Sequence, residues 1–488
     1  MPASRHRGTA SIAFAACFAA LAVACREPSG MRAEPAWPDT LPAAAAFGAP
    51  RGWTPVRAVL HVHSILSHDA CDGDPVDEEG RPNEACLERF RRAICAVGLG
   101  AVFLTEHDRR MVEVDSLADA LLLRDGDRRV AVGDATRASR IACPGHPEGA
   151  LLFPGGENQL MPIALDSLPS GTREEKRAFW DADTTGTGAA YREWGAVVLM
   201  PHPEDEPLAT IAALDPDGIE IYNPHANFSF KHRAHQGLSR FGAAWSLVPF
   251  YLRTTPAHPD LALLAMFRSN RNAIGKWDAL LASGRDPFGF GASDAHENSL
   301  PWPLADGERG DAYERMLPWV TNVLLVRGAD PVSAGDVEAI EEAVRAGRFY
   351  VAFEAWGTPG DFDFRLEGPS GVTEMGDSAV LAHGQRLVVE LPRVVGPAGG
   401  SPPTVRARLY RIAAGGRREI VAESTGRIEA EVRAPGAYRV EVGIVPRHLE
   451  PWLGGTGYLR EVPWIYSNPI RVGALRATPA AAPNAGAP

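Results

Sequence analysis

Four short histidine-bearing strings, three of which also carry acidic or hydroxyl side chains, stand at intervals along the chain, each directly after an apolar run. They read Leu60-His61-Val62-His63-Ser64, Thr105-Glu106-His107-Asp108, Met200-Pro201-His202-Pro203 and Ser293-Asp294-Ala295-His296. Short apolar runs are typical of buried strands, so each string is expected where a strand ends. Imidazole and carboxylate groups together suit borderline divalent ions. The strings therefore constrain the chain to a fold that brings four strand ends together, and we interpret them as one polynuclear metal site.

Short apolar runs alternate with helix-like stretches from residue 56 to about residue 328. This alternation predicts an α/β fold with a parallel sheet. About seven strands are predicted, among them 151–153, 218–222 and 320–326, and helices are predicted over 86–97, 173–182, 261–268 and 273–282. That number of strands suffices to close a barrel, in which the strand ends converge on one face. Distant histidine strings can meet on such a face.

The pattern changes after Pro359, where short and often alternating segments are separated by Gly, Pro or Ser. These segments predict strands of a β-sandwich. A chain of 488 residues is also too long for one ordinary domain. We therefore expect a β/α barrel domain over 51–357, an all-β sandwich domain over 358–475 and a disordered tail over 476–488, which is mostly Ala and Pro.

The N-terminus has the layout of a secretory signal, with Arg5 and Arg7 before an apolar stretch at 10–24. We expect a signal peptide over 1–25 and a flexible tether over 26–50. The small residues 22–24 before Cys25 resemble a bacterial lipobox, which would make Cys25 the lipidated anchor of an exported lipoprotein, periplasmic or on the outer surface. Simple cleavage after Ala24 is the alternative.

Export permits disulfides, and four further cysteines follow the signal at positions 71, 86, 95 and 143. None of them forms a C-x-x-C pair, so two disulfides are favoured over a thiolate metal site, with the pairing left open. The net charge of −12 disfavours an extended nucleic-acid surface, so a small substrate is expected.

Five motifs occur in one order along residues 55–353. They are His61-x-His63-Ser64 followed by Ser67-His68-Asp69, Thr105-Glu106-His107, Gly156-Glu157, His202-Pro203 and Asp294-x-His296. In these motifs the chain resembles the PHP superfamily, the polymerase and histidinol phosphatase metallohydrolases. The resemblance implies a distorted barrel of seven β/α units that carries up to three divalent metal ions.

The resemblance also implies roles for single residues. His61, His63, Glu157 and Asp294 would hold one metal, and Glu157 would bridge to a second. His68, His107 and His296 would complete the cluster, with His202 on the bridged side. Glu106 replaces the usual aspartate and is expected to orient His107. Residues 159–169 lack a histidine found in some relatives, and Glu220, Asn223 or His225 could supply the missing ligand or a substrate contact.

The expected activity is hydrolysis of a small phosphoester by a metal-activated water, with Glu157 and His202 as catalytic groups and two or three zinc, manganese or iron ions. Two alternatives stay open: a carboxyl-ester or carbamate hydrolase with the same metal site, and a surface binding protein with a non-catalytic barrel. Four arginines could contact a phosphoryl group, although surface solvation is favoured for each: Arg109, Arg110, Arg137 and Arg140. Other histidines, His448 among them, are expected on the surface.

Overall fold

The computed structural model describes residues 37–38, 40–76, 81–107, 111–144, 146–182, 184–224, 247–252, 257–327 and 336–473. Over these residues the chain is mixed α/β with more strands than helices. The predicted signal peptide, Cys25, the tail at 476–488 and His225 lie outside the described residues, and so do residues 26–36 and 39 of the predicted tether. Among the described helices, none is long and apolar enough to span a membrane.

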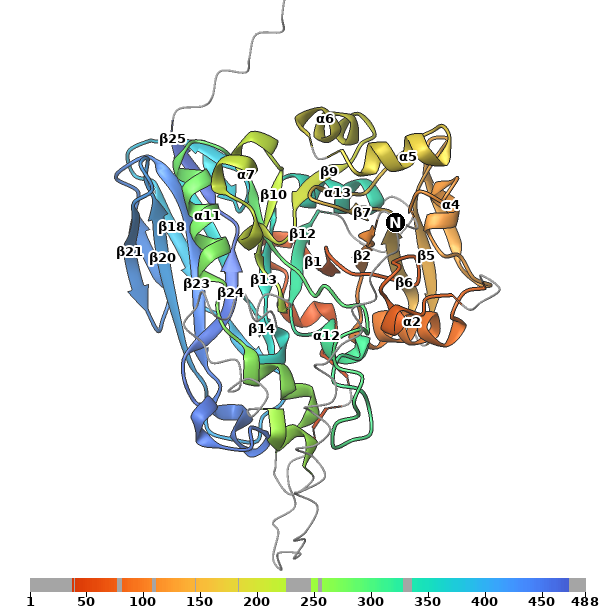
Figure 1. Cartoon of the computed structure of the whole chain (residues 1–488). Helices are drawn as coiled ribbons and strands as arrows, with labels where there is room; N and C mark the ends of the chain where they lie inside the picture. Colours follow the sequence, from red (N-terminus) through yellow and green to blue (C-terminus); the bar gives the residue numbers. More distant parts are fainter. Residues whose placement is uncertain are drawn as a thin grey trace, which may run out of the picture.

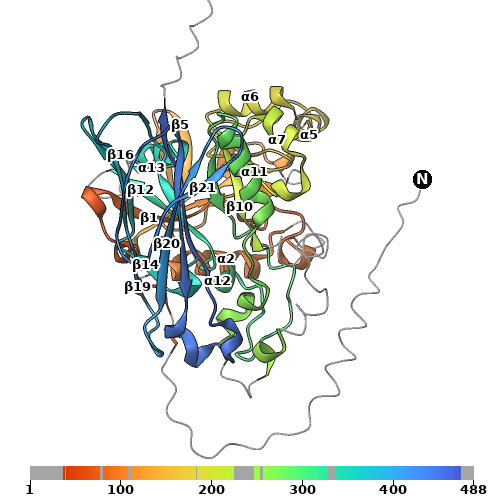
Figure 2. The ribbon, with the colours of Figure 1, turned by 90° about the vertical axis from the view of Figure 1, so that its left-hand side faces the viewer.

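The largest sheet has thirteen strands and runs through both parts of the chain (Figures 1 and 2). Its order along one path is β17 (Ser378–Val380), β25 (Ile470–Gly473), β23 (Gly436–Val445), β24 (Val462–Ser467), β13 (Phe349–Ala352), β12 (Thr321–Val326), β1 (Thr54–Val59), β2 (Ala101–Phe103), β6 (His146–Phe153), β5 (Ala135–Cys143) and β4 (Arg128–Val132). Off this path, β20 (Thr404–Ile412) pairs with β23 and with β21 (Arg418–Ser424). Strands β1, β2 and β6 are parallel, so their carboxyl ends lie at one edge.

A second sheet carries the later histidine strings. It contains β8 (Met161–Ile163), β9 (Val197–Met200), β10 (Gly218–Tyr222) and β11 (Phe288–Gly291), of which β9 to β11 are parallel. Isolated bridges from Gly155 to Ile163 and from Val62 to Ala295 link it to the large sheet. The short strands β3 (Glu106–His107) and β7 (Gly156–Glu157) pair with each other and form a separate two-stranded sheet. Because the strands are divided among separate sheets, the closed barrel stays a prediction.

The two longest described helices each begin after an asparagine cap. Helix α2 (Glu84–Val97) begins after the Asn83 cap, whose side chain accepts from the Cys86 N–H, and ends at Gly98 with a positive φ of 67°. Helix α11 (Arg271–Ala282) begins after the Asn270 cap. The predicted helix at 261–268 is instead a 3₁₀ helix, Pro259–Met266. The other helices are α4 (Leu117–Ala120), α5 (Arg173–Trp180), α6 (Thr185–Glu193), α7 (Leu208–Leu214), α12 (Tyr313–Met316) and α13 (Asp336–Arg345).

From residue 358 on, the described elements are strands and short 3₁₀ turns, in agreement with an all-β C-terminal region. A four-stranded sheet contains β16 (Gly371–Glu374), β15 (Asp363–Gly368), β18 (Arg386–Glu390) and β22 (Ile428–Glu431), and β14 (Thr358–Gly360) pairs with β19 (Arg393–Val395). However, β24 pairs with β13 across the expected division at 357/358, so one hydrogen-bonded sheet joins both regions. The division into two domains stays a prediction.

Two disulfides form, Cys71–Cys86 and Cys95–Cys143, which gives the pairing that the sequence left open. His448 was expected on the surface, but it is buried and its Nε2 lies 2.8 Å from the carbonyl oxygen of Trp356. The hydrogen bond with a buried carbonyl explains how a histidine fits into this part of the core.

Candidate metal centre

The histidines of the first string lie just beyond β1, where Val62 bridges Ala295. Alternate residues of an extended segment share a side, so both imidazoles point the same way. Their Nε2 atoms lie 3.2 Å apart, and both side chains are fully buried. Since β2, β7, β9 and β11 end nearby, the other strings reach the same place and surround His61 and His63 with further ligand atoms.

Two groups of ligand atoms result. One contains His61, Glu157, His202 and Asp294, and the other contains His63, His107 and His296. We call them the His61 group and the His63 group. Within each group the ligand atoms lie within 4.8 Å of one another.

Glu157 lies between the two groups and faces both. Its Oε1 lies 3.3 Å from His61 Nε2 and 3.2 Å from His202 Nε2. Its Oε2 lies 3.2 Å from His63 Nε2 and 3.5 Å from His107 Nδ1. Two atoms that each bind a tetrahedral ion at about 2.1 Å are roughly 3.4 Å apart. The spacing therefore fits a carboxylate that bridges two ions.

Other buried groups orient the histidine rings. His61 Nδ1 lies 2.8 Å from Glu220 Oε2, and His296 Nδ1 lies 2.7 Å from the carbonyl oxygen of Asp294. Each Nδ1–H can donate to its acceptor, so the Nε2 lone pair is left toward the centre. Metal-binding histidines are held in the same way in many proteins.

Ser67 orients the ring of His63 and connects that ring to Glu106. The Ser67 hydroxyl donates to Glu106 Oε2 at 2.8 Å, so it must accept from His63 Nδ1, also at 2.8 Å. The backbone N–H of His107 donates to the same hydroxyl oxygen at 3.1 Å. Glu106 also accepts from the backbone N–H of Ser64. Glu106 thus helps to orient His63 and His107 through Ser67, and it is not itself a member of either ligand group.

The buried carboxylates of the centre raise the pKa values of its histidines. Burial lowers the pKa of His63, but the adjacent carboxylates of Asp294 and Glu157 outweigh it and raise the pKa to about 9. Burial also lowers the pKa of His202, yet the charge of Glu220 and the hydrogen bond with Glu157 raise it to about 10. In the metal-free protein, protons on these imidazoles balance the buried carboxylates. Divalent ions would displace them.

The donor set fits metal ions. Glu157 Oε2 is buried without a hydrogen-bond donor, although a buried polar atom normally has a partner. His202 and Asp294 also hold the backbone in the left-handed region, with φ values of 43° and 49°. Such conformations are costly for residues other than glycine and gather at functional sites. A cation between Glu157 and the histidines would satisfy the buried oxygen.

The structure brings together seven of the eight predicted ligands, namely His61, His63, His107, Glu157, His202, Asp294 and His296. The eighth, His68, belongs to neither group, and its ring centroid lies 5.3 Å from that of His107. Its neighbour Asp69 also belongs to neither group, although its Oδ2 lies 3.5 Å from His107 Nε2 and 3.8 Å from His296 Nε2. The grouping also differs from the implied one, because His61 and His63 fall into different groups.

Several supporting residues add to the predicted set. Glu220 and Asn223 were weak candidates, and they act as anchors: Asn223 Nδ2 donates to Asp294 Oδ2 at 3.0 Å. The Tyr313 hydroxyl, which sequence reasoning missed, donates to the carbonyl oxygen of His63 at 2.9 Å. No motif marks Tyr313, which comes from a separate short helix.

The arginines proposed as phosphoryl contacts do not strengthen the site. Arg109 and Arg110 lie outside the described residues. Arg137 forms ion pairs with Asp166 and Glu341. Arg140 lies on β5 and is 5% exposed.

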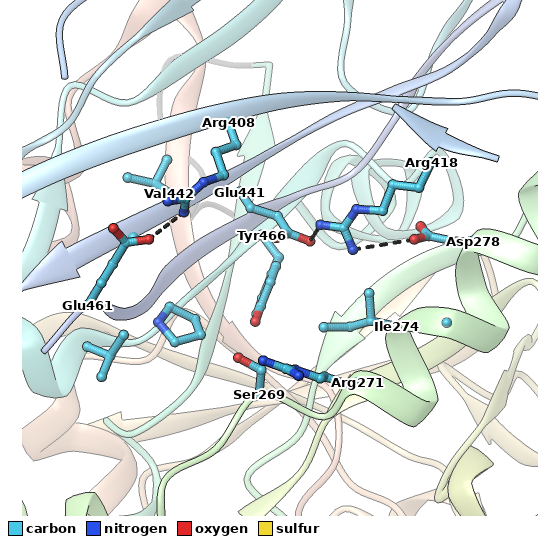
Figure 3. A pocket seen from close by; sticks show the side chains of 14 residues that line it. Ser269, Arg271, Ile274, Asp278, Arg408, Arg418, Glu441, Val442, Glu461 and Tyr466 are labelled. Atoms are coloured by element: carbon cyan, nitrogen blue, oxygen red, sulfur yellow. Dashed lines mark hydrogen bonds and ion pairs between the residues drawn. The ribbon is translucent and has the colours of Figure 1, made fainter. Parts of the chain in front are cut away.

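A separate cleft of about 530 Å³ lies between α11 and strands β20, β21, β23 and β24 (Figure 3). Its charged side chains face one another: Arg408 pairs with Glu461, and Arg418 pairs with Glu441 at 2.7 Å. The cleft has no histidine in its lining, so it is not part of the metal centre.

No protein-family model and no curated protein matches the chain. What the centre can do is therefore argued from its geometry.

Proposed function

We propose that this protein is a metal-dependent phosphoesterase of the PHP type, with divalent ions in the His61 and His63 groups. The observation that carries the proposal is the position of Glu157, whose two oxygens face the two groups at 3.2–3.5 Å. Zinc, manganese and iron all accept imidazole and carboxylate ligands. The linked sheets around the centre are, in this proposal, the distorted β/α barrel of that superfamily.

Ions held in the two groups would favour a substrate with anionic oxygens, because phosphoester oxygens can bind such ions directly and the ions stabilise the charge that develops on them. Ions bound in such a pair supply a water of lowered pKa and polarise the ester.

The protein side chains would divide the remaining tasks. His202 has 35% of its side chain exposed, whereas Glu157 has 5% and Asp294 has 1%. His202 is therefore the member of the His61 group that a substrate reaches, and as a ligand it would hold the ion on the side from which the substrate arrives. Glu157 fixes the spacing of the two groups, and Asn223 holds Asp294 in place through its hydrogen bond.

Export as a lipoprotein is part of the proposal. The two disulfides are compatible with export, because disulfides persist in oxidising compartments, whereas the lipid anchor rests on the sequence before Cys25 alone.

The test combines metal analysis with three hydrolysis assays. The wild type, His61→Ala and the matched control His383→Ala are analysed for bound metal and assayed with aryl phosphomonoester, phosphodiester and carboxyl-ester probes. His383 is exposed and lies in the C-terminal region, so its replacement should change nothing. We expect two ions and phosphoester turnover in the wild type and in His383→Ala, and in His61→Ala loss of turnover together with loss of at least the ion of the His61 group.

Other outcomes separate the alternatives. Turnover of carboxyl esters alone would favour the carbamate- and ester-cleaving branch of the superfamily. A wild type that binds metal but turns over no probe would revive the surface binding protein, and a metal-free wild type would overturn the proposal.

A further inference from the structure

The loop of residues 67–72 lies against every member of the His63 group. Ser67 Oγ lies 2.8 Å from His63 Nδ1 and accepts from the His107 N–H at 3.1 Å. Asp69 Oδ2 lies 3.5 Å from His107 Nε2 and 3.8 Å from His296 Nε2. The position of this loop therefore sets the position of all three histidines.

The far end of the loop is tied to the segment that carries His296. The Cys71 N–H donates to the carbonyl oxygen of His296 at 2.9 Å, and the Asp72 N–H donates to that of Glu297 at 2.8 Å. A disulfide joins Cys71 to Cys86 in the first turn of α2, and both cysteines are buried, at 5% and 0% exposure. The covalent bond thus links α2 to the loop at the point where the loop meets the His296 segment.

The backbone at this junction is held in an unfavourable conformation. Cys71, Asp72 and Glu297 have φ values of 57°, 61° and 54°. Left-handed conformations of such residues persist only where the surroundings enforce them. Arg89 of α2 adds a second tie, because its Nε and Nη2 donate to Glu297 Oε2 at 2.8 and 2.6 Å. Helix α2 therefore enforces the junction through the disulfide and through this ion pair.

The His61 group has different anchors. His61 is oriented by Glu220 on β10, and Asp294 by Asn223 just after β10. His202 follows β9 directly. Among the contacts described for this group, the orienting ones come from the second sheet rather than from the loop at 67–72.

We infer that the Cys71–Cys86 disulfide positions the His63 group as a metal site, and that the His61 group does not depend on it. The inference rests on the proposed function in one respect, that both groups bind an ion. The disulfide is a positioning element: it acts through Ser67, Asp69 and the backbone of His296.

The second disulfide provides a matched control, because Cys95 lies near the end of the same helix and is bonded to Cys143 at the end of β5. We compare the wild type, Cys71→Ala/Cys86→Ala and Cys95→Ala/Cys143→Ala as full chains. Bound zinc is measured per folded chain after dialysis, with circular dichroism as the check of folding. The wild type and the control should hold two ions, and Cys71→Ala/Cys86→Ala should hold one.

Adding His202→Ala to the Cys71→Ala/Cys86→Ala variant identifies the remaining ion, since its loss would place it in the His61 group. A Cys71→Ala/Cys86→Ala protein that keeps two ions would overturn the inference, as would equal losses in the two disulfide variants. A wild type without metal would instead overturn the proposed function.

Ser67→Ala tests the role of the loop in a chain that keeps both disulfides. Its bound zinc can be measured even if Cys71→Ala/Cys86→Ala does not fold. The substitution removes the contact through which the loop reaches His63, so it should also halve the bound zinc. Two ions retained in Ser67→Ala would contradict the argument that the loop positions this group.

Discussion

Three kinds of acceptor orient the histidine rings of the metal centre: the Glu220 carboxylate, the Ser67 hydroxyl and the Asp294 carbonyl oxygen. Each fixes the Nδ1 proton of one ring and leaves Nε2 for an ion. For His61 and His63 the orienting residue, Glu220 or Ser67, is not itself a ligand, whereas Asp294 belongs to the His61 group and also orients His296. At His61 and His63 an anchor can therefore be replaced without removing a ligand, and the effect on metal affinity can be measured directly.

Glu220→Gln tests the carboxylate anchor of His61. The amide oxygen can still accept from Nδ1, but it is neutral, so His61 becomes a weaker donor to the ion. Replacing such an outer carboxylate typically lowers metal affinity about 10- to 100-fold. Competition with a chromogenic chelator measures the affinity, and Glu338→Gln, an exposed carboxylate on α13, is the control. Equal affinities in Glu220→Gln and the wild type would contradict an orienting role for Glu220.

The pH dependence of the metal-free protein follows from the raised pKa values. His63 and His202 have pKa values of about 9 and about 10 in the folded chain, against 6.5 for the unfolded reference. A pKa raised on folding stabilises the protein fully below pH 6.5, and this stabilisation is lost as pH rises through 9 to 10. We therefore expect the Tm measured in a chelator to fall between neutral pH and pH 10.

Zinc should reverse this trend, because protons compete with it for the same nitrogens. Metal affinity is then expected to rise over the pH range in which the chelated protein loses stability. Thermal unfolding followed by circular dichroism, with and without zinc, measures both effects. Parallel curves in the two conditions would show that His63 and His202 do not exchange protons for metal.

At the scale of the elements, the sequence predicted where the ligands lie more reliably than how they are grouped. The strings follow β1, β2, β9 and β11 as expected, since an apolar run before a polar string marks a strand end. Helices α2 and α11 were predicted within two residues at each end, because their caps and apolar spacing are local signals. The 3₁₀ helix at Pro259–Met266 was not predicted, since a short apolar run does not distinguish helix types.

His68 was predicted as a ligand from its position in the first motif, but it belongs to neither group, and its neighbour Asp69 contacts His107. The loop after His63 turns through a 3₁₀ helix, Cys71–Gly73, with positive φ at Cys71 and Asp72, and it is fixed by hydrogen bonds to the distant His296 segment. Spacing along the chain cannot report contacts made by residues more than 200 positions away. Those contacts turn Asp69 toward His107.

The packing of β11 against β12 and β13 can be tested with one glycine. A Cβ at Gly291 would lie 2.4 Å from Val320 Cγ2 and 2.6 Å from Val351 Cγ1, which is too close. Gly291→Ala should therefore destabilise the protein by about 1–3 kcal/mol. Since β11 leads into Asp294, metal affinity should fall as well. Urea unfolding and chelator competition measure the two effects.

Gly275→Ala in α11 is the matched control, because no atom lies within 4 Å of its added Cβ. Alanine is a better helix former than glycine, so this variant should be more stable by up to about 1 kcal/mol. Equal stabilities of Gly291→Ala and Gly275→Ala would contradict the close packing of β11.

At the scale of the whole molecule, the region from residue 358 on is joined to the region before it by hydrogen bonds and a buried ion pair. Strand β24 pairs with β13, and the Trp464 indole donates to the carbonyl oxygen of Gly357 at 2.8 Å. Arg439 of β23 is fully buried and donates to Asp278 of α11 at 2.9–3.1 Å. Removing one partner of such a buried pair typically costs about 3–5 kcal/mol. These contacts indicate that the two regions stabilise each other.

A chain that ends at residue 357 tests whether the N-terminal region folds alone. Truncation would expose the edge of β13, which lies one strand away from β12 and two from β1, the strand that leads to His61 and His63. It would also leave Asp278 without Arg439 and uncover Trp356, whose indole now donates to the Pro463 carbonyl oxygen. We expect no cooperative thermal transition and no bound zinc in this fragment, whereas a chain that ends at residue 473 should match the full-length protein in both measurements. If the 357-residue fragment instead unfolds cooperatively and holds two ions, the division into two independent domains is right, and the continuous sheet contributes little to the metal centre.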